Sequence, residues 1–344
     1  MQDVRITIST SSLFKLLGFV LLLGLLYLIR DILLLIFIAL IFAALIDPFA
    51  RWLQGKKIPR GLAVVAIYIV VFGLLALIIS LLSPVLIHDV PQFFSNFNKY
   101  IQDIQQNPFV QRAIGIIDQI APSVNPGAQT LEGNAVVGVQ STLTGLFSTV
   151  TGVFGGIFSF VLVLVMTFYM VVHDDPLRRI FRSVIPEQYV PYVSQLFDKI
   201  RDKLGAWMRG QLILSAIIGL LVFIGLAIIG VRYAAVLGLL AALLEFVPYV
   251  GPLFAAIPAL LISFSQGGPV MFSLVLVMYI VIQQFENHIL VPKVMQRAVG
   301  LNPIFSIVAI LVGAKLAGVP GALLAIPVAT ALSVFLQDVP TKKF

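Results

Sequence analysis

Long runs of apolar residues, separated by short polar segments, constrain this chain more than any other feature. A helix crosses the roughly 30 Å hydrocarbon core of a bilayer with about 20 mostly apolar residues. Eight apolar blocks stand out, at residues 13–29, 32–46, 62–87, 146–172, 212–231, 234–264, 270–285 and 304–336, and several reach that length. Backbone amides in lipid must bond within their own segment, and these runs lack the strict alternation of a membrane β-barrel. The sequence therefore predicts an all-α integral membrane protein with about eight transmembrane helical blocks.

The composition supports this prediction and excludes other classes of protein. Of 344 residues, 60% are hydrophobic and 11% are charged, against about 25% charged in ordinary soluble domains. The formal charge of +7 does not indicate nucleic-acid binding, because most lysines and arginines lie between the apolar blocks, as in cytoplasmic loops of membrane proteins. The chain has no cysteine, and its three histidines have no second histidine at ligand spacing. We expect no metal site, no cofactor and no nucleic-acid partner.

The charges between the blocks predict the orientation of the chain. Segment 51–60 contains four basic residues and no acid, and segment 173–210 contains seven basic residues, so both belong on the cytoplasmic side. Segment 87–145 contains two basic and four acidic residues and belongs outside. Basic residues near both ends of the chain place both termini in the cytoplasm. We expect a multi-pass protein of the inner (plasma) membrane.

This pattern divides the chain into five parts. They are transmembrane helices 1–3 (1–86), an extracytoplasmic amphipathic segment (87–145), transmembrane helix 4 (146–172), a cytoplasmic amphipathic helical segment (173–210) and a C-terminal transmembrane region with broken hairpins (211–344). The first two blocks meet at Arg30 and Asp31. Their combined length is too great for one straight crossing, so we predict a hairpin with this pair at its tip. Because many blocks follow, the first is interpreted as a membrane span rather than a cleaved signal.

Proline and glycine interrupt the block at residues 243–260, which reads LLEFVPYVGPLFAAIPAL and contains Glu245. A proline removes an amide donor and clashes with the preceding turn, so this helix must break around Pro248 to Pro252, with Gly251 inside the break. Carbonyl groups that lose their donor in lipid are costly. The broken backbone should therefore be buried in protein or line a wet cavity.

A polar face occurs in the segment 283–292, which reads QQFENHILVP. Helical spacing of three and four residues brings Gln283, Glu286 and Asn287 onto one side of the helix. An acid and two amides facing lipid would be expensive. We expect these side chains to face inward, towards a pathway or a helix partner.

A second interrupted span covers residues 312–327, which read VGAKLAGVPGALLAIP. Gly318, Pro320 and Gly321 predict a sharp hairpin or unwound turn, with Lys315 beside it. Residues 250–258 also align with residues 319–327 in a short apolar match. Two interpretations stay open: inverted repeats that enclose a site near the midplane of a secondary transporter, or two independent hairpins selected for packing.

The buried acids are the strongest candidate site residues. A carboxyl group in a low-dielectric medium can exchange a proton or hold a cation, which would give Glu245 and Glu286 a role in transport. The alternative is that one or both lie at the inner membrane interface. Lys315 either pairs with one of these carboxylates or extends its ammonium group to water.

Enzymatic functions lack sequence support. The chain contains no HExxH zinc-protease motif and no GxxxxGK[ST] phosphate-binding loop for ATP-driven transport. We expect no enzyme, and any transport should be passive or driven by an ion gradient.

The eight-block layout and the EFVPYVGP, QQFENHILVP and closing glycine–proline stretches resemble the autoinducer-2 exporter family of bacterial and archaeal membrane proteins. The resemblance covers nearly the whole chain and is most specific in its C-terminal half. It implies export of autoinducer-2, a small polyol signal for quorum sensing, or Na⁺(Li⁺)/H⁺ antiport as in some members. It also implies a homo-oligomer, pentamers included. The pathway residues that it implies are Glu245, Pro248, Gly251, Gln283, Glu286, Asn287, Pro320 and Gly321, whereas Lys315 has no place in the shared pattern.

Together, these observations predict a secondary transporter that exports a small polar solute resembling autoinducer-2. The partners would be that solute, the lipid bilayer and H⁺ or Na⁺. A cation/proton antiporter, a channel and a non-transporting scaffold are the alternatives.

Overall fold

The computed structural model describes residues 17–21, 24–25, 27–112, 157–173, 186–295 and 303–338. Within these ranges all regular structure is helical and no strand occurs. Five helices are long and apolar enough to cross a bilayer: Arg30–Gly55, Arg60–Pro84, Glu187–Ile229, Val250–Val294 and Ile304–Leu336. The prediction of an all-α integral membrane protein is confirmed.

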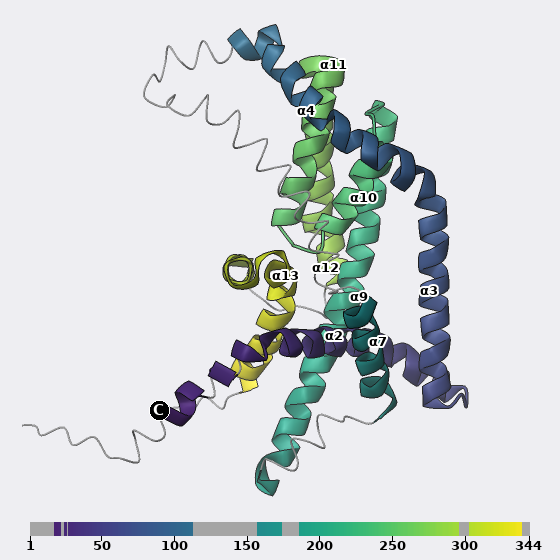
Figure 1. Cartoon of the computed structure of the whole chain (residues 1–344), viewed down its shortest axis with the longest axis vertical. Helices are drawn as coiled ribbons and strands as arrows, with labels where there is room; N and C mark the ends of the chain where they lie inside the picture. Colours follow the sequence, from purple (N-terminus) through teal and green to yellow (C-terminus); the bar gives the residue numbers. More distant parts are fainter. Residues whose placement is uncertain are drawn as a thin grey trace, which may run out of the picture.

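The described elements follow one another in a fixed order. They are α2 (Arg30–Gly55), α3 (Arg60–Pro84), the π-helical turn η1 (Val85–Asp89), α4 (Val90–Gln106), α7 (Ile157–Val172), η3 (Glu187–Tyr189), α9 (Val190–Ile229), α10 (Ala234–Leu244), α11 (Val250–Phe285), the π-helical turn η4 (Glu286–Leu290), α12 (Val291–Val294) and α13 (Pro303–Asp338). Helices α3, α9, α10 and α11 run along the long axis of the molecule, whereas α2 lies across that axis and α4 slants over one end (Figure 1).

The hairpin predicted at Arg30 and Asp31 is wrong. The amide of Ile29 donates to the carbonyl of Leu25, and the amide of Leu33 donates to the carbonyl of Ile29, each at 3.0 Å. Helical hydrogen bonding therefore passes through this point without a reversal. Helix α2 begins at Arg30 and lies across the long axis of the molecule (Figure 1).

Helix α9 joins two parts that the sequence separates. It runs for 40 residues without interruption, so residues 190–210 of the charged amphipathic segment and residues 212–229 of the following apolar block form one rod. At about 1.5 Å per residue this rod is roughly twice as long as the hydrocarbon core is thick. It ends at Gly230, whose φ of 85° is the left-handed conformation in which glycine commonly closes a helix.

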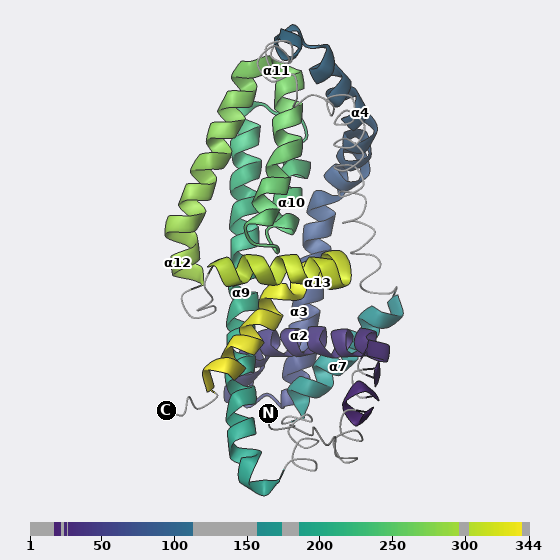
Figure 2. The ribbon, with the colours of Figure 1, turned by 90° about the vertical axis from the view of Figure 1, so that its left-hand side faces the viewer.

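The break predicted around Pro248 to Pro252 is confirmed. Helix α10 ends at Leu244 and α11 begins at Val250, with Tyr249 at a left-handed φ of 66° between them. A Cβ atom on Gly251 would lie 1.9 Å from the Leu244 carbonyl oxygen, so only glycine lets the two helices approach this closely. The returning helix reverses again at Gly268 (φ 63°, ψ −156°), so α11 consists of two arms (Figure 2).

The hairpin predicted in the second interrupted span, residues 312–327, is also confirmed. Backbone angles leave the helical region at Ala317 and Gly318, which divides α13 into two arms. The arms touch backbone to backbone at Gly313 and Gly321. The hairpin packs on α9 and on the first break through a shared cluster of apolar side chains, namely Trp207, Val247, Ile310, Ala325 and Ile326.

The two aligned sequence stretches occupy equivalent local positions. Val250 begins the second helix after the first break, and Val319 follows the non-helical Gly318 in α13. However, the first arm of α13 lies across the axes of α9 and α11 (Figure 2). Inverted repeats and two independent hairpins therefore both stay predictions.

Helix α4 forms within the predicted outer amphipathic segment. Phe93 and Tyr100 bury their rings in the main apolar cluster, which α9, α10 and α11 build. Asp103 accepts a hydrogen bond from Ser265 at 2.9 Å. This helix thereby covers the end of the bundle where α11 reverses (Figure 2). The rest of the predicted segment, residues 113–145, lies outside the described residues.

The contact between the arms of α13 yields a stability prediction. In Gly321→Ala the new Cβ would lie 2.0 Å from the carbonyl oxygen of Gly313, so the arms must separate. Overpacking of this kind costs about 1–3 kcal/mol, and we expect a lower thermal unfolding midpoint in detergent. Gly73→Ala is the matched control, because no atom lies within 4 Å of the added Cβ. Equal midpoints for the two variants would contradict the packing argument.

Candidate functional site

The first acid of the candidate site lies at the end of a broken helix. Glu245 caps the C-terminus of α10, where its amide still donates to the carbonyl of Ala241 at 2.9 Å. Its side chain is only 2% exposed. The break places this carboxyl group partway along α9 rather than at either end, because Gln211 near the middle of α9 contacts the same residue.

The second acid, Glu286, directly follows the second arm of α11. Glu286 is the first residue of η4, and it is 6% exposed. Its carboxyl group lies beside that of Glu245. The Gln283 amide donates to Glu286 Oε2 at 3.1 Å and reaches Asn287 Oδ1 at 3.5 Å, so these three residues share one face, as their spacing predicts. Glu286 turns inward, whereas Asn287 is exposed.

Two polar residues of α9 complete this site, and the sequence analysis did not identify them. Gln211 donates its amide to the main-chain carbonyl of Glu245, and Ser215 donates its hydroxyl to the carbonyl of Ala242. Both acceptors belong to the last turn of α10, where the break removes helical donors. The sequence contained a signal for these two residues. Gln211 and Ser215 are four residues apart at the start of an apolar block, a spacing that places two polar side chains on one face of a helix.

The charge balance of the site is unusual. Among the described residues, no lysine or arginine forms an ion pair with Glu245 or Glu286. Two adjacent carboxyl groups in a low dielectric cannot both ionise without a compensating charge. Glu245 Oε2 and Gln211 Oε1 are also buried without a hydrogen-bond donor in the described part of the chain, which costs about 1–3 kcal/mol per group. The arrangement can therefore take up a proton or a small cation.

The remaining predicted site residues play different structural parts. Pro248 and Gly251 build the turn that holds Glu245, whereas Pro320 and Gly321 belong to the hairpin of α13. Lys315 is exposed, and within the described ranges it forms no ion pair with either carboxylate. The predicted alternative in which Lys315 pairs with a buried acid is therefore wrong.

The family pattern described as "AI-2E family transporter" matches residues 16–341. The chain belongs to this family. It is 28% identical over 305 residues to the putative transport protein YueF of Bacillus subtilis, covering 85% of this chain and 80% of that protein. It is 27% identical over 319 residues to the putative transport protein YrrI of the same organism, covering 90% and 86%. The AI-2 transport protein TqsA of Escherichia coli is 26% identical over 312 residues, covering 88% and 83%. The protein is a multi-pass membrane transporter.

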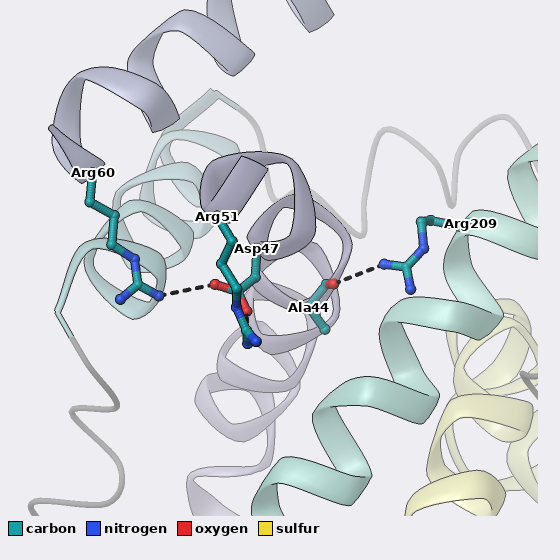
Figure 3. Close-up of polar contacts among 5 residues, drawn as sticks. All are labelled: Ala44, Asp47, Arg51, Arg60 and Arg209. Atoms are coloured by element: carbon teal, nitrogen blue, oxygen red, sulfur yellow. Dashed lines mark hydrogen bonds and ion pairs between the residues drawn. The ribbon is translucent and has the colours of Figure 1, made fainter. Parts of the chain in front are cut away.

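A second buried charge cluster in this AI-2E family member lies where α2 meets α3. Asp47 of α2 is 4% exposed, and its carboxylate pairs with Arg51 of the same helix and with Arg60 at the start of α3 (Figure 3). The Arg60 Nη2 atom lies 3.0 Å from Asp47 Oδ1. The sequence analysis counted these arginines only as orientation signals. Unlike the glutamate pair, this acid is compensated.

The same stretch of α2 is tied to α9 by a displaced helical hydrogen bond. Pro48 lacks an amide hydrogen, so the Ala44 carbonyl loses the donor that residue 48 would supply. Arg209 of α9 donates to this carbonyl at 3.4 Å (Figure 3). A Cβ on Gly205 would lie 2.3 Å from the same oxygen, so glycine permits the close crossing. Proline in one helix and glycine in the other thus define the α2–α9 junction.

The Asp47 cluster predicts unequal costs for its members. Asp47→Asn removes the compensating charge from the Arg60 side chain, which is 17% exposed. Breaking such a buried pair costs about 3–5 kcal/mol, and we expect a large fall in the thermal unfolding midpoint. Arg51→Ala should cost less than about 1 kcal/mol, because that arginine is 59% exposed and solvent screens its charge. Similar losses for both variants would show that the pairing with Arg60 does not stabilise the junction.

Proposed function

We propose that this protein is a secondary transporter that exports a small polar solute resembling autoinducer-2. The observation that carries the proposal is the buried pair Glu245 and Glu286 at the end of a broken helix, with no basic partner among the described residues. A purely structural pair would be expected to have a counter-charge, as Asp47 does. Intramembrane acids without one are typical of ion and proton pathways.

The surroundings of the pair support a transport pathway. Pro248 and Gly251 interrupt the helix beside it, and backbone that departs from helix at membrane depth is tolerated where it is buried or lines a cavity. Gln283 and Asn287 continue the polar surface from Glu286. These residues offer hydrogen bonds to a polyol, and uptake or release of a proton or Na⁺ at the carboxyl pair would couple its movement to an ion gradient. The Pro320–Gly321 turn belongs to a second hairpin packed against the same break.

The choice of solute rests on the relatives. The Escherichia coli relative is named an AI-2 transport protein, and it aligns over most of both chains. We extend that activity to this chain as part of the proposal. A homo-oligomer is an accompanying proposal, which only the family resemblance implies. An inner-membrane location with both termini in the cytoplasm is proposed from the distribution of basic residues.

The second candidate function is Na⁺(Li⁺)/H⁺ antiport, which the same carboxyl pair favours. In an antiporter the cation and the proton would compete for the carboxylates, and no organic solute would be needed. A pathway that conducts as a channel would instead give unitary currents in planar bilayers.

A flux assay in liposomes separates these functions. With purified protein, labelled autoinducer-2 should cross the membrane saturably, whereas an antiporter should dissipate a pH gradient when Na⁺ or Li⁺ is added. We expect Glu245→Gln with Glu286→Gln to lower the flux about tenfold or more, since a loss of about 1.4 kcal/mol in a barrier or affinity has that effect. Glu187→Gln, at an exposed acid of η3, is the matched control and should retain full flux.

Unchanged flux in the double glutamine variant would remove the carboxyl pair from the mechanism. Saturable transport of neither autoinducer-2 nor cations by the wild type would reject both candidate functions.

A further inference from the structure

The corner between α2 and α3 gathers basic and aromatic side chains. Helix α2 lies across the long axis of the molecule and α3 runs along it, so residues 56–59 turn the chain at one end of α3 (Figure 1). Phe49 and Trp52, near the end of α2, are exposed, and Lys56 places its Nζ 3.8 Å from the centre of the Trp52 ring. A cation over an indole face is attracted by the ring. The corner therefore holds a positive charge directly beside an exposed apolar ring.

The positive charge at the tip of this corner has no acidic partner in the described part of the chain. The arginines beside Asp47 pair with that acid, and two aspartates of α9 also attract Arg51. Lys56 and Lys57, in contrast, are exposed, and neither forms an ion pair within the described ranges. These two lysines are therefore available to an anion from outside the chain.

Directly beyond the corner, α3 exposes apolar side chains on almost every side. Among its 25 residues only Ala63 and Val64 are buried. The exposed Leu62, Val65 and Ile69 follow one another at helical spacing, starting at the corner. Residues 62–72 rise about 15 Å, which is half of the roughly 30 Å hydrocarbon core. An acyl chain of one leaflet can therefore lie along this stripe while its headgroup reaches the corner.

We propose that this corner binds an anionic phospholipid. Lys56 and Lys57 hold the phosphate, the Trp52 ring lies at the level of the glycerol backbone, and the acyl chains follow the stripe on α3. Basic residues beside a membrane span attract anionic lipids, and tryptophan is enriched at the boundary between headgroups and hydrocarbon. A zwitterionic lipid offers the same chains, but its own cation offsets the attraction of its phosphate to the lysines. Lipid binding here goes beyond the proposed function, because it needs neither the carboxyl pair nor a transported solute.

The test measures lipid binding rather than transport. The thermal unfolding midpoint of the detergent-purified, full-length protein is followed against dioleoyl phosphatidylglycerol, dioleoyl phosphatidylcholine and glycerol phosphate, each added at constant ionic strength. A ligand that binds the folded state raises the midpoint saturably. We expect phosphatidylglycerol to do so at lower concentrations than phosphatidylcholine, which has the same acyl chains. Glycerol phosphate, which has no chains, should leave the midpoint unchanged.

Two double variants assign the effect to the corner. Lys56→Gln with Lys57→Asn removes both charges, and asparagine tolerates the positive φ of 67° at position 57. The apparent affinity for phosphatidylglycerol should fall about tenfold or more, since each lysine near an anionic surface contributes a factor of about five. Lys99→Gln with Lys315→Gln is the matched control, because it removes two exposed lysines outside α2 and α3. It should retain the lipid-dependent shift.

A third variant tests the aromatic ring. Trp52→Leu keeps an apolar side chain but removes the indole over which Lys56 lies. The apparent affinity for phosphatidylglycerol should fall about two- to fivefold, which is the range of an exposed cation–π contact. An unchanged affinity would contradict the assignment of Trp52 to the site.

Four further outcomes would overturn the inference. The first is an equal response to phosphatidylglycerol and phosphatidylcholine, which would indicate a general effect of lipid. The second is an equal response to glycerol phosphate, which would indicate a site for a free anion. The third is a full lipid-dependent shift in Lys56→Gln with Lys57→Asn. The fourth is an equal loss of the shift in the control variant, which would indicate attraction by net charge alone.

Discussion

This protein is organised by hydrogen bonds to backbone carbonyls that have lost their helical donors. A proline or a helix break removes each of these donors. In lipid no water replaces a lost amide, so each such carbonyl needs a donor from the protein itself. Arg209 supplies one to Ala44, whose helical donor is absent at Pro48. Gln211 supplies another to Glu245 at the break that ends α10. All these donors lie within two turns of α9, which makes this helix the centre to which the crosswise α2 and the broken hairpin both attach.

The two clusters of buried acids differ in whether basic residues compensate their charge. Asp47 is surrounded by arginines, and its cluster joins α2 to α3. Glu245 and Glu286 lie beside each other, Gln283 donates to Glu286, and no lysine or arginine of the described residues forms an ion pair with either acid. An acid that is paired with arginines keeps its charge and stabilises a junction permanently. An acid pair without a counter-charge binds or releases protons or cations according to their concentration. We therefore assign the Asp47 cluster a structural role and propose the glutamate pair as the transport site.

The break between α10 and α11 is the point where the two interrupted hairpins meet. Two features define the geometry of the turn between α10 and α11. Gly251 lies against the carbonyl of Leu244, and Tyr249 has a positive φ. Val247 in this turn packs against the α13 hairpin, and Gln211 donates to the main-chain carbonyl of Glu245 just before it. A ligand at the carboxyl pair would therefore act on a point where both interrupted hairpins meet.

The sequence by itself determined the class of the fold, the positions of the breaks and the polar face around Glu286. These depend on local physics: apolar length sets membrane spans, proline removes amides at known places, and helical spacing puts Gln283, Glu286 and Asn287 on one side. Only the tertiary structure decided that α2 continues through Arg30 and lies crosswise, that Glu245 meets Glu286, that Gln211 joins them and that Lys315 stays outside. Hydropathy distinguishes lipid from protein and water, but it does not say which apolar helices become neighbours. That choice depends on close packing at single glycines and on which side chain reaches an unsatisfied carbonyl, and both are set by contacts between residues distant in the chain.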